Sequence, residues 1–447
     1  MPCLNAVCKA EGELSSPIRL TPDQHTILLH PLTQRGIVTV ARSTTRWTEK
    51  AIRIGDLSDY ARQLAGVTDI FMSQQTFYGW RRIAQLAQLA AAYVDLDYHK
   101  TSWRGFAPAY VADQALRALD DQRMPTPSCI LFTGRGLLCL WFHDIVPRSA
   151  LPRWNAMQKA LGEGLRDFGA DARALDAARV FRLVGTVNSK SGETVRLIWS
   201  DRLEPTRWDF DTLADEILPH TRAEIHSLAA ERAKRKANGR SAVAPAVRLT
   251  AGTWWETVLS DLQKLRRVRW FGELPSGQRD TWLFLAVNAM SWLCPPAVLK
   301  REALALAQEC GGWKHRESEQ RFSTIFHRAQ MSAAGEMVEW NGEMVDARYR
   351  FRAETIVQWL SITPAEMREG DLRALGDADH LRANHYQRTI DSRRRAGVKS
   401  RDEQVAERLQ IGMRALWMQQ EGMPIRQIAI QLGTSVGLIH KAIAEVK

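Results

Sequence analysis

The segment from Tyr93 to Lys100 reads Tyr-Val-Asp-Leu-Asp-Tyr-His-Lys and follows a run of small apolar residues, Leu89 to Ala92. This composition predicts a short buried strand, in which successive side chains point to opposite faces. Asp95 and Asp97 would then project side by side from one face. Like charges at that distance raise each other's pKa unless a cation neutralises them. The pair is therefore either a solvated strand end or a site for a hard metal ion, and this segment alone leaves both interpretations open.

The length of 447 residues exceeds what one ordinary core holds, so roughly two to four domains are expected. Hydrophobic residues make up 45% of the chain and charged residues 25%, as in globular proteins, and no apolar run is long enough to span a bilayer. The first residues lack a charged region followed by an apolar one. We therefore expect no secretion signal and a cytoplasmic location.

The cysteines show neither a Cys-x-x-Cys pair nor a metal-binding spacing to histidine, so they are predicted to be core residues rather than zinc ligands or disulfides. They are Cys3, Cys8, Cys129, Cys139, Cys294 and Cys310. The formal net charge of +11 and the pI near 9.5 favour a polyanionic partner such as nucleic acid. An acidic membrane surface would attract the same charge, but the sequence has no evident basic amphipathic anchor.

The pattern of apolar residues divides the chain into segments, which predicts a multidomain α+β protein. Residues 1–50 contain strand-like runs and form either an N-terminal extension or the first strands of the next unit. In residues 51–215 helical and strand patterns are interspersed, as in an α+β or α/β domain. A basic, helix-prone linker is expected over 216–249. An all-α helical domain then covers 250–346, and a C-terminal helical region covers 347–447.

Two apolar runs flank the sequence Thr133-Gly134-Arg135-Gly136, a pattern typical of a β-hairpin. Glycines permit close backbone approach, and free N–H groups beside Arg135 would make a phosphate cradle. An ordinary hairpin turn with one surface arginine explains the same residues.

A further acid precedes several side chains that commonly bind phosphate. Asp176 is followed by Arg182, Asn188 and Lys190 within a short stretch. Arginine, lysine and amide groups are the donors that recognise phosphate oxygens. Asp171 is a rival for the role of this acid.

Residues 423–443 have the pattern of a helix-turn-helix, in which Pro424 suits the first helical turn, Gly433 the turn, and Thr434 the cap of the second helix. The face predicted to enter a major groove carries Ser435, Gly437, His440 and Lys441. A helical hairpin that only packs is the alternative. The upstream cluster Arg393-Arg394-Arg395 favours the DNA-binding interpretation.

The segment from about residue 50 to 200 resembles the archaeo-eukaryotic primase superfamily, and specifically the primase-like replication proteins of plasmids and other mobile elements. The resemblance depends on blocks that occur in the same order in this chain. They are Asp95-Leu96-Asp97, the turn Thr133-Gly134-Arg135-Gly136 before an apolar strand that ends at Trp141, and Asp176 followed by Arg182, Gly185 and Asn188. The stretch Ser73 to Tyr78 ahead of the acid pair fits the same group.

The resemblance implies that Asp95, Asp97 and Asp176 bind Mg²⁺ or Mn²⁺ and that nucleoside triphosphates are substrates. Two such ions about 3.5–4 Å apart would activate a 3′-hydroxyl and stabilise the departing pyrophosphate. The triphosphate would be bound by Thr133, Gly134, Arg135, Gly136, Arg182, Asn188 and Lys190. In the superfamily the second block commonly ends in a histidine that binds the nucleotide, and in this chain the matching position is Leu138.

We therefore expect a DNA-replication protein of a mobile element, with a primase-like nucleotidyltransferase domain that synthesises primers and a C-terminal helix-turn-helix that binds origin DNA. Its partners would be single-stranded template DNA and duplex origin DNA. A separate helicase and host replication proteins are also expected, because the chain has no Walker-type loop. The alternative is a non-catalytic DNA-binding initiator or regulator with a degenerate primase fold. A relaxase is disfavoured, since His99 and His143 form no metal-binding cluster in the sequence.

Overall fold

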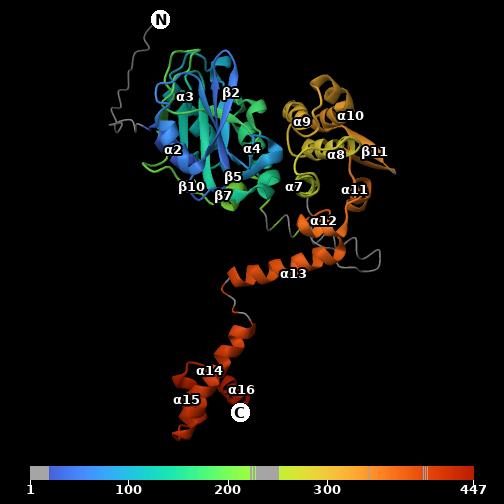
Figure 1. Cartoon of the computed structure of the whole chain (residues 1–447). Coiled ribbons are helices and arrows are strands. Elements are labelled where there is room, and N and C mark those ends of the chain that lie inside the picture. The colour runs from blue at the N-terminus through green and yellow to red at the C-terminus, as the bar shows by residue number, and fades with distance from the viewer. Residues whose placement is uncertain are drawn as a thin grey trace, which may run out of the picture. The chain divides into compact units, whose positions relative to one another are not determined.

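The computed structural model describes residues 20–221, 224, 227, 251–340, 342–395, 397, 399 and 401–446 (Figure 1). The chain divides into two compact units, Met1–Leu375 and Gly376–Lys447. Most of the basic linker expected over residues 216–249, as well as Cys3 and Cys8, lies outside the described residues. Within the described ranges no helix is long and apolar enough to cross a membrane.

The first unit contains a ten-stranded sheet in the order β8-β3-β1-β4-β5-β7-β6-β9, with β2 paired to β1 and β10 paired to β7. The strands are β1 (Ile37–Ser43), β2 (Trp47–Arg53), β3 (Ile70–Ser73), β4 (Thr76–Phe77), β5 (Leu86–Leu96), β6 (Cys129–Phe132), β7 (Leu137–Pro147), β8 (Val180–Arg182), β9 (Arg196–Ser200) and β10 (Arg207–Trp208). The helices of this part are α1 (Pro22–Leu29), α2 (Ile54–Arg62), α3 (Pro108–Asp121), α4 (Leu151–Gly164) and α5 (Phe210–Ile217), and α3 and α4 flank the sheet (Figure 1).

The sheet is antiparallel in every pairing of its named strands except that of β10 with β7. Short connections such as the turn between β6 and β7 can only join antiparallel neighbours. The domain is therefore α+β, and the alternative description as α/β, which implies a mainly parallel sheet, is wrong.

The N-terminal part of the described chain belongs to the sheet. β1 lies between β3 and β4, and its register with β2 pairs Ile37 with Arg53. Residues 37–50 therefore lie in strands of the same sheet as the segment that follows them. The boundary expected at residue 51 falls inside β2, while residues 1–19 lie outside the description.

The strand predicted around Tyr93 is the end of the long strand β5, and α4 packs directly on it. Tyr93 and Trp154 make an edge-to-face contact with ring centroids 5.6 Å apart. Gln158 accepts a hydrogen bond from the Tyr93 backbone N–H at 2.8 Å and donates one to its carbonyl oxygen at 2.9 Å. The buried Gln158 side chain thus makes the backbone hydrogen bonds that a neighbouring strand would otherwise make with Tyr93. No strand of the described chain is paired there, so a loop can pair with the C-terminal end of β5.

A helical part follows in the same unit and shares one apolar core with the sheet. It consists of α7 (Ala251–Trp270), α8 (Arg279–Ser291), α9 (Pro296–Gly311), α10 (His315–Ala333), the hairpin β11 (Met337–Trp340) and β12 (Glu343–Asp346), α11 (Ala353–Leu360) and α12 (Pro364–Glu369). Ion pairs and hydrogen bonds join it to the sheet, among them Arg148 with Glu256 at 2.7 Å and the Ile83 N–H with Glu302 at 2.9 Å.

The second unit begins at Gly376, later than the boundary expected at residue 347. The boundary lies later because α12 contacts α7 of the first unit, where Arg269 of α7 forms an ion pair with Glu366 of α12 at 2.5 Å. The second unit contains α13 (Ala378–Arg395), α14 (Arg401–Gln420), α15 (Ile425–Gln431) and α16 (Val436–Val446). Its small core is formed by Ala415, Ile428, Ala429, Ile439 and Ile443.

Candidate functional site

The predicted acid pair lies at the C-terminal end of β5. Asp95 is a partly buried residue of the strand and lies opposite Leu138 of β7 in the antiparallel register. Asp97 follows the last strand residue and precedes the short helical turn Tyr98–Lys100. The two carboxylates are close enough for the charge of Asp97 to raise the pKa of Asp95. Because β5 ends at Leu96, Asp97 is not a strand residue. Its position beside Asp95 is set by the turn of the chain after the strand, and not by the alternation of side chains along the strand.

Asp171 reaches the same place through backbone pairing. β5 lies between β4 and β7, but the short β4 does not reach its C-terminal end. There β5 pairs with the loop after α4, and Leu96 and Ala170 form an isolated antiparallel bridge. The Asp171 N–H donates to the Asp95 carbonyl oxygen at 2.9 Å, and the Asp97 N–H donates to the Gly169 carbonyl oxygen at 2.9 Å. The rival acid considered from the sequence is therefore the one that lies beside Asp95.

The electrostatics of Asp95 reflect this crowding. Burial raises its pKa most, and the negative charges of Asp97 and Asp171 raise it further, to about 7. The positive charges of Arg179 and Lys100 act in the opposite direction without cancelling the effect. Close to neutral pH, Asp95 is consequently divided between its protonated and ionised forms, and a bound cation would favour the ionised form.

Two residues that follow Asp97 complete the rim of this acid cluster. The Lys100 ammonium lies 2.5 Å from Asp97 Oδ2, and this hydrogen bond raises the pKa of Lys100. The His99 Nδ1 atom lies 3.9 Å from Asp97 Oδ1, and burial lowers the pKa of the imidazole although Asp97 opposes that effect. Sequence reasoning gave neither residue a role at this site. The i,i+3 spacing of Asp97 and Lys100 was the available signal.

Asp176, the third acid of the expected set, lies in a different environment. Its side chain is 0% exposed and pairs with Arg179 at 2.8 Å and with Arg301 of α9 at 3.5 Å. It also accepts a hydrogen bond from the Ala178 N–H at 3.1 Å. Through these partners the carboxylate joins the segment before β8 to α9. The role of Asp176 as a metal ligand stays a prediction.

The turn at residues 133–136 packs against the end of β5 and against the loop at residues 188–191. Asn188 donates from Nδ2 to the Thr133 carbonyl oxygen at 2.8 Å. Gly134 has φ +94°, and a Cβ built there would lie 2.7 Å from the Asn188 Cβ. A Cβ on Gly136 would lie 2.6 Å from the Leu96 carbonyl oxygen. Segments that are distant in sequence thus meet at the acid pair, and glycine is required for the approach.

The expected phosphate-binding cations differ in their availability. Arg135 and Lys190 are exposed and have no ion-pair partner in the described part of the chain. Arg182 instead pairs with the buried carboxylate of Asp69, and its guanidinium lies 4.6 Å from the centre of the Phe71 ring. Burial alone would raise the pKa of Asp69, but hydrogen bonds from Ser189 and Arg182 outweigh it and the pKa is lowered. Arg182 thus has a structural partner, which no local sequence signal identified, and its contact with the nucleotide stays a prediction.

The two carboxylates of the acid pair are suited to a magnesium site in which substrate phosphates supply further ligands. Among the described residues, no group of three or more histidine, cysteine, aspartate and glutamate side chains is arranged to hold a metal ion. Mg²⁺ commonly takes one or two carboxylates and fills its remaining positions with water and substrate phosphates. Asp95 and Asp97 meet this smaller requirement.

In the second unit, α15 and α16 are separated by a short turn that contains Gly433 at φ +62°. Ser435, Gly437, His440 and Lys441 are exposed, and Ile439 is buried. The Leu438 N–H donates to the Ser435 hydroxyl at 3.3 Å, so Ser435 rather than Thr434 caps the second helix. Of the cluster Arg393-Arg394-Arg395 at the end of α13, only the Arg394 side chain lies within the description, and it is exposed.

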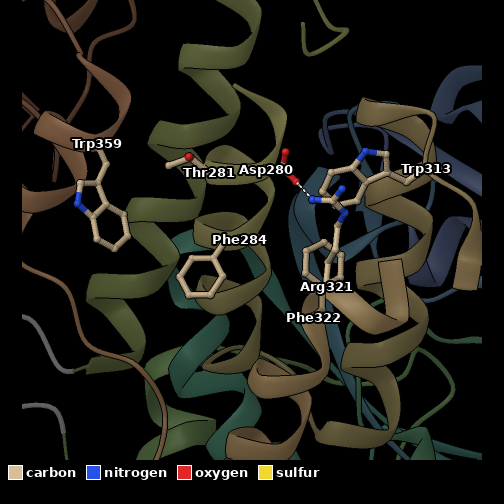
Figure 2. Close-up of a pocket in the computed structure, with 7 residues that line it drawn as sticks. All are labelled: Asp280, Thr281, Phe284, Trp313, Arg321, Phe322 and Trp359. Atoms are coloured by element: carbon tan, nitrogen blue, oxygen red, sulfur yellow. Dashed lines mark hydrogen bonds and ion pairs between the residues drawn. The ribbon is translucent and has the colours of Figure 1, made fainter. Parts of the chain in front are cut away.

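The helical part of the first unit contains a separate pocket of about 650 Å³ (Figure 2). Trp359 and Phe284 line one side of it, and Trp313 with Arg321 lines the other. Arg321 already pairs with Asp280 and with Glu317, so its cation is not free for a phosphate. None of the residues expected at the nucleotide site lines this pocket.

No family model matches the chain. A curated "Replication protein" from Clostridium perfringens is 37% identical over 135 residues, which is 29% of this chain and 32% of that protein. The chain thus spans about a third of the length of this curated relative. The match confirms the resemblance to a replication protein that the sequence motifs predicted.

The comparison with solved structures found primases, all at TM-scores below 0.5. The archaeo-eukaryotic primase domain of the cyanophage S-2L primase-polymerase matches at 16% identity and a TM-score of 0.31, over 43% of this chain and 95% of that one. Primase RepB′ matches at 13% identity and a TM-score of 0.30, over 70% of this chain and 99% of that one. The catalytic domain of primase RepB′ in complex with initiator DNA matches at 12% identity and a TM-score of 0.29, over 48% and 98% of the two chains.

Proposed function

We propose that this chain is a primase-like replication protein of a mobile element and that its sheet domain synthesises primers by metal-dependent nucleotidyl transfer. One observation carries the proposal: the acid pair, the turn at residues 133–136 and the loop at residues 188–191 meet at the end of β5. Carboxylates beside a glycine turn and free cations are the combination that phosphoryl transfer requires.

In this proposal Asp95 and Asp97 hold a divalent ion, Mg²⁺ or Mn²⁺, and Asp171 adds a third negative charge beside them. A bound ion would supply neutralisation of the triphosphate charge and activation of the primer hydroxyl. Occupancy would remove the proton that Asp95 holds near neutral pH, since a cation favours the ionised carboxylate. The two-ion arrangement with Asp176 has no support from the placement of that residue.

The chain's own cations would orient the nucleoside triphosphate. Arg135 and Lys190 are exposed cations on two of the meeting segments, and N–H groups of the glycine turn other than that of Gly136 would donate to phosphate oxygens. Thr133 donates its hydroxyl to the Gly136 carbonyl oxygen at 3.1 Å, which holds the turn in shape. Asn188 fixes the same turn from the opposite side.

DNA would be the partner in two forms. Single-stranded template would be read at the sheet domain. Duplex origin DNA would contact α16 through Ser435, His440 and Lys441, whose exposure and the net charge of +11 support the proposal. A separate helicase and host replication proteins remain predicted partners.

A second candidate is a non-catalytic DNA-binding initiator or regulator that keeps the same fold. The specific observation that favours it is the apolar Leu138 opposite Asp95, where the superfamily commonly has a nucleotide-binding histidine. Such a protein would bind DNA through the same surfaces without making primers.

A primer-synthesis assay on single-stranded DNA with Mg²⁺ or Mn²⁺ distinguishes the two candidates. We expect wild-type protein to make product and Asp95→Ala and Asp97→Ala to lose at least about a hundredfold of it. Asp121→Ala is the matched control, because Asp121 is an exposed acid at the end of α3. If both site variants make as much product as wild type, the catalytic assignment is wrong. If wild type makes none while binding DNA, the initiator is favoured.

A further inference from the structure

A cluster of aromatic rings lies directly beside the acid pair. Trp103 and Phe106 come from the loop after Lys100, Tyr110 from the first turn of α3, and Phe168 from the short helical turn that precedes Gly169. The Asp97 N–H donates a hydrogen bond to the carbonyl oxygen of Gly169, the residue after Phe168, so the backbone that carries one ring is paired with the backbone at the acid site. Neither the sequence motifs nor the proposed chemistry uses these rings.

The rings form two stacked pairs, and Trp103 of the first pair contacts both rings of the second. Trp103 stacks on Phe168 with centroids 5.1 Å apart and an interplanar angle of 16°. Phe106 stacks on Tyr110 with centroids 5.5 Å apart and an angle of 23°. Trp103 also contacts Phe106 at 5.9 Å in an edge-to-face arrangement. The inner stack is anchored by Phe168, whose side chain is buried.

The outer stack is exposed in a way that packing does not explain. Phe106 is 49% exposed and Tyr110 is 47% exposed, although both are large apolar side chains. Adjacent exposed rings outside a core are a feature of ligand and partner sites. Two parallel rings with free faces or edges present the surface on which an unpaired base stacks.

The charges around the rings favour a polyanion. Arg104 and Arg166 are exposed and lack an ion-pair partner within the described ranges, while Asp167 is the exposed acid on the same segments. Arg104 lies between Trp103 and Phe106 in the chain, so its cation accompanies the rings. Alternation of aromatic and arginine side chains is the combination found in sites for single strands.

We infer that Phe106 and Tyr110, supported by Trp103 and Phe168, form a platform on which bases of single-stranded nucleic acid stack beside the acid pair. Every base has a π-face, so the platform would bind without sequence preference and would disfavour duplex DNA, whose bases are already stacked. The inference rests on the proposed function for its role in template positioning, but binding to a single strand can be measured without any synthesis.

The test is the affinity of the full chain for a fluorescently labelled oligothymidylate, measured by anisotropy at fixed salt with a chelator and no nucleotide present. We expect the double variant Phe106→Ala/Tyr110→Ala to bind about ten- to a hundredfold more weakly than wild type. Tyr110→Phe and Phe106→Tyr keep the rings and should bind like wild type. Trp340→Ala is the matched control, since Trp340 is 70% exposed on the hairpin strand β11.

Two further measurements separate stacking from charge. An oligonucleotide with abasic sugars should bind wild type as weakly as the double variant binds the intact strand. The double variant should keep the wild-type salt dependence, whereas Arg104→Ala should reduce the slope by about one phosphate contact. The inference is overturned if the double variant binds the intact strand like wild type, or if Trp340→Ala loses as much affinity.

The outcome is distinguishable from that of the proposed function. Asp95→Asn should bind the single strand like wild type, because the platform does not need the carboxylate. If wild type makes no primers yet the platform variants lose affinity, the platform stands and the catalytic proposal fails. If primers are made, the double variant should raise the KM for template severalfold with little change in kcat at saturating template. An unchanged KM would count against the platform.

Discussion

Leu138 lies directly opposite Asp95 on the antiparallel strands β7 and β5. Directly opposed residues of an antiparallel pair have their side chains on the same face, within contact distance. The apolar neighbour withholds a hydrogen-bond donor from the carboxylate, and burial is the largest cause of the raised pKa of Asp95. Leu138, where the sequence resemblance led us to expect a histidine, therefore offers Asp95 no hydrogen-bond donor.

The raised pKa predicts how Asp95 affects stability across pH. Its folded value of about 7 exceeds the ordinary value of 3.8, so the folded state binds more protons than the unfolded state between these pH values. The contribution of Asp95 to the free energy of unfolding should therefore fall as pH rises from about 4 to about 7. Without divalent cations, Asp95→Asn should be more stable than wild type at about pH 8 by roughly 1–3 kcal/mol.

Urea unfolding at several pH values in the presence of a chelator checks this prediction. The advantage of Asp95→Asn should shrink towards about pH 5, where wild type is protonated at this residue. Asp121→Asn, at an exposed position, should show no such trend. An advantage that is constant over the whole pH range would contradict the assignment of the raised pKa to Asp95.

Substitutions of Asp176 and Asp171, the two candidates for the third acid, should differ in their effects on stability and on primer yield. Asp176→Ala leaves Arg179 without its buried carboxylate and Arg301 with Glu302 alone, so the free energy of unfolding should fall by about 2–4 kcal/mol. Asp171→Asn should cost about 1 kcal/mol or less, since the carboxylate only caps the Arg173 N–H. Asp171→Asn should still reduce primer yield at least about tenfold. Denaturant unfolding and the primer assay check both; a stable, inactive Asp176→Ala would reverse our assignment.

Gly134 and Gly192 provide a matched pair for the turn. Both have positive φ, +94° and +73°, but only Gly134 would place a Cβ against Asn188, whereas Gly192 has no atom within 4 Å. Gly134→Ala should therefore lower the free energy of unfolding by about 2–4 kcal/mol and Gly192→Ala by about 1 kcal/mol. Gly134→Ala should also raise the KM for nucleotide. Equal effects of the two substitutions would show that the contact with Asn188 is unimportant.

In the second unit Gly412 allows α14 to approach α16. A Cβ there would lie 2.3 Å from the Ala442 carbonyl oxygen, whereas a Cβ on Gly437 would meet nothing within 4 Å. We expect Gly412→Ala to reduce hydrogen-exchange protection of α16 and to weaken duplex binding at least about tenfold. Gly437→Ala should leave protection intact or raise it by up to about 1 kcal/mol. Unchanged duplex binding by Gly412→Ala, with α16 deprotected, would argue against α16 as the DNA-binding helix.

The local sequence predicted those parts of the protein that depend on neighbouring residues. The apolar run before Asp95 indicated a buried strand, which is the end of β5. The four described cysteines, Cys129, Cys139, Cys294 and Cys310, are buried and free as expected for core residues. The pattern of residues 423–443 gave two helices with the expected exposed positions. Periodicity and glycine placement suffice here, because helices and turns form from contacts a few residues apart.

Sequence by itself thus determined the strand, the glycine turn and the order of the motif blocks. Only the tertiary structure decided which acid accompanies Asp95, because Asp171 is placed by backbone pairing with the free side of β5 and Asp176 by arginines that include Arg301 of α9. It likewise assigned Arg182 to Asp69, and it brought Phe168 onto Trp103. These partners are distant in the chain, and side-chain chemistry at one position does not reveal which distant group will satisfy it.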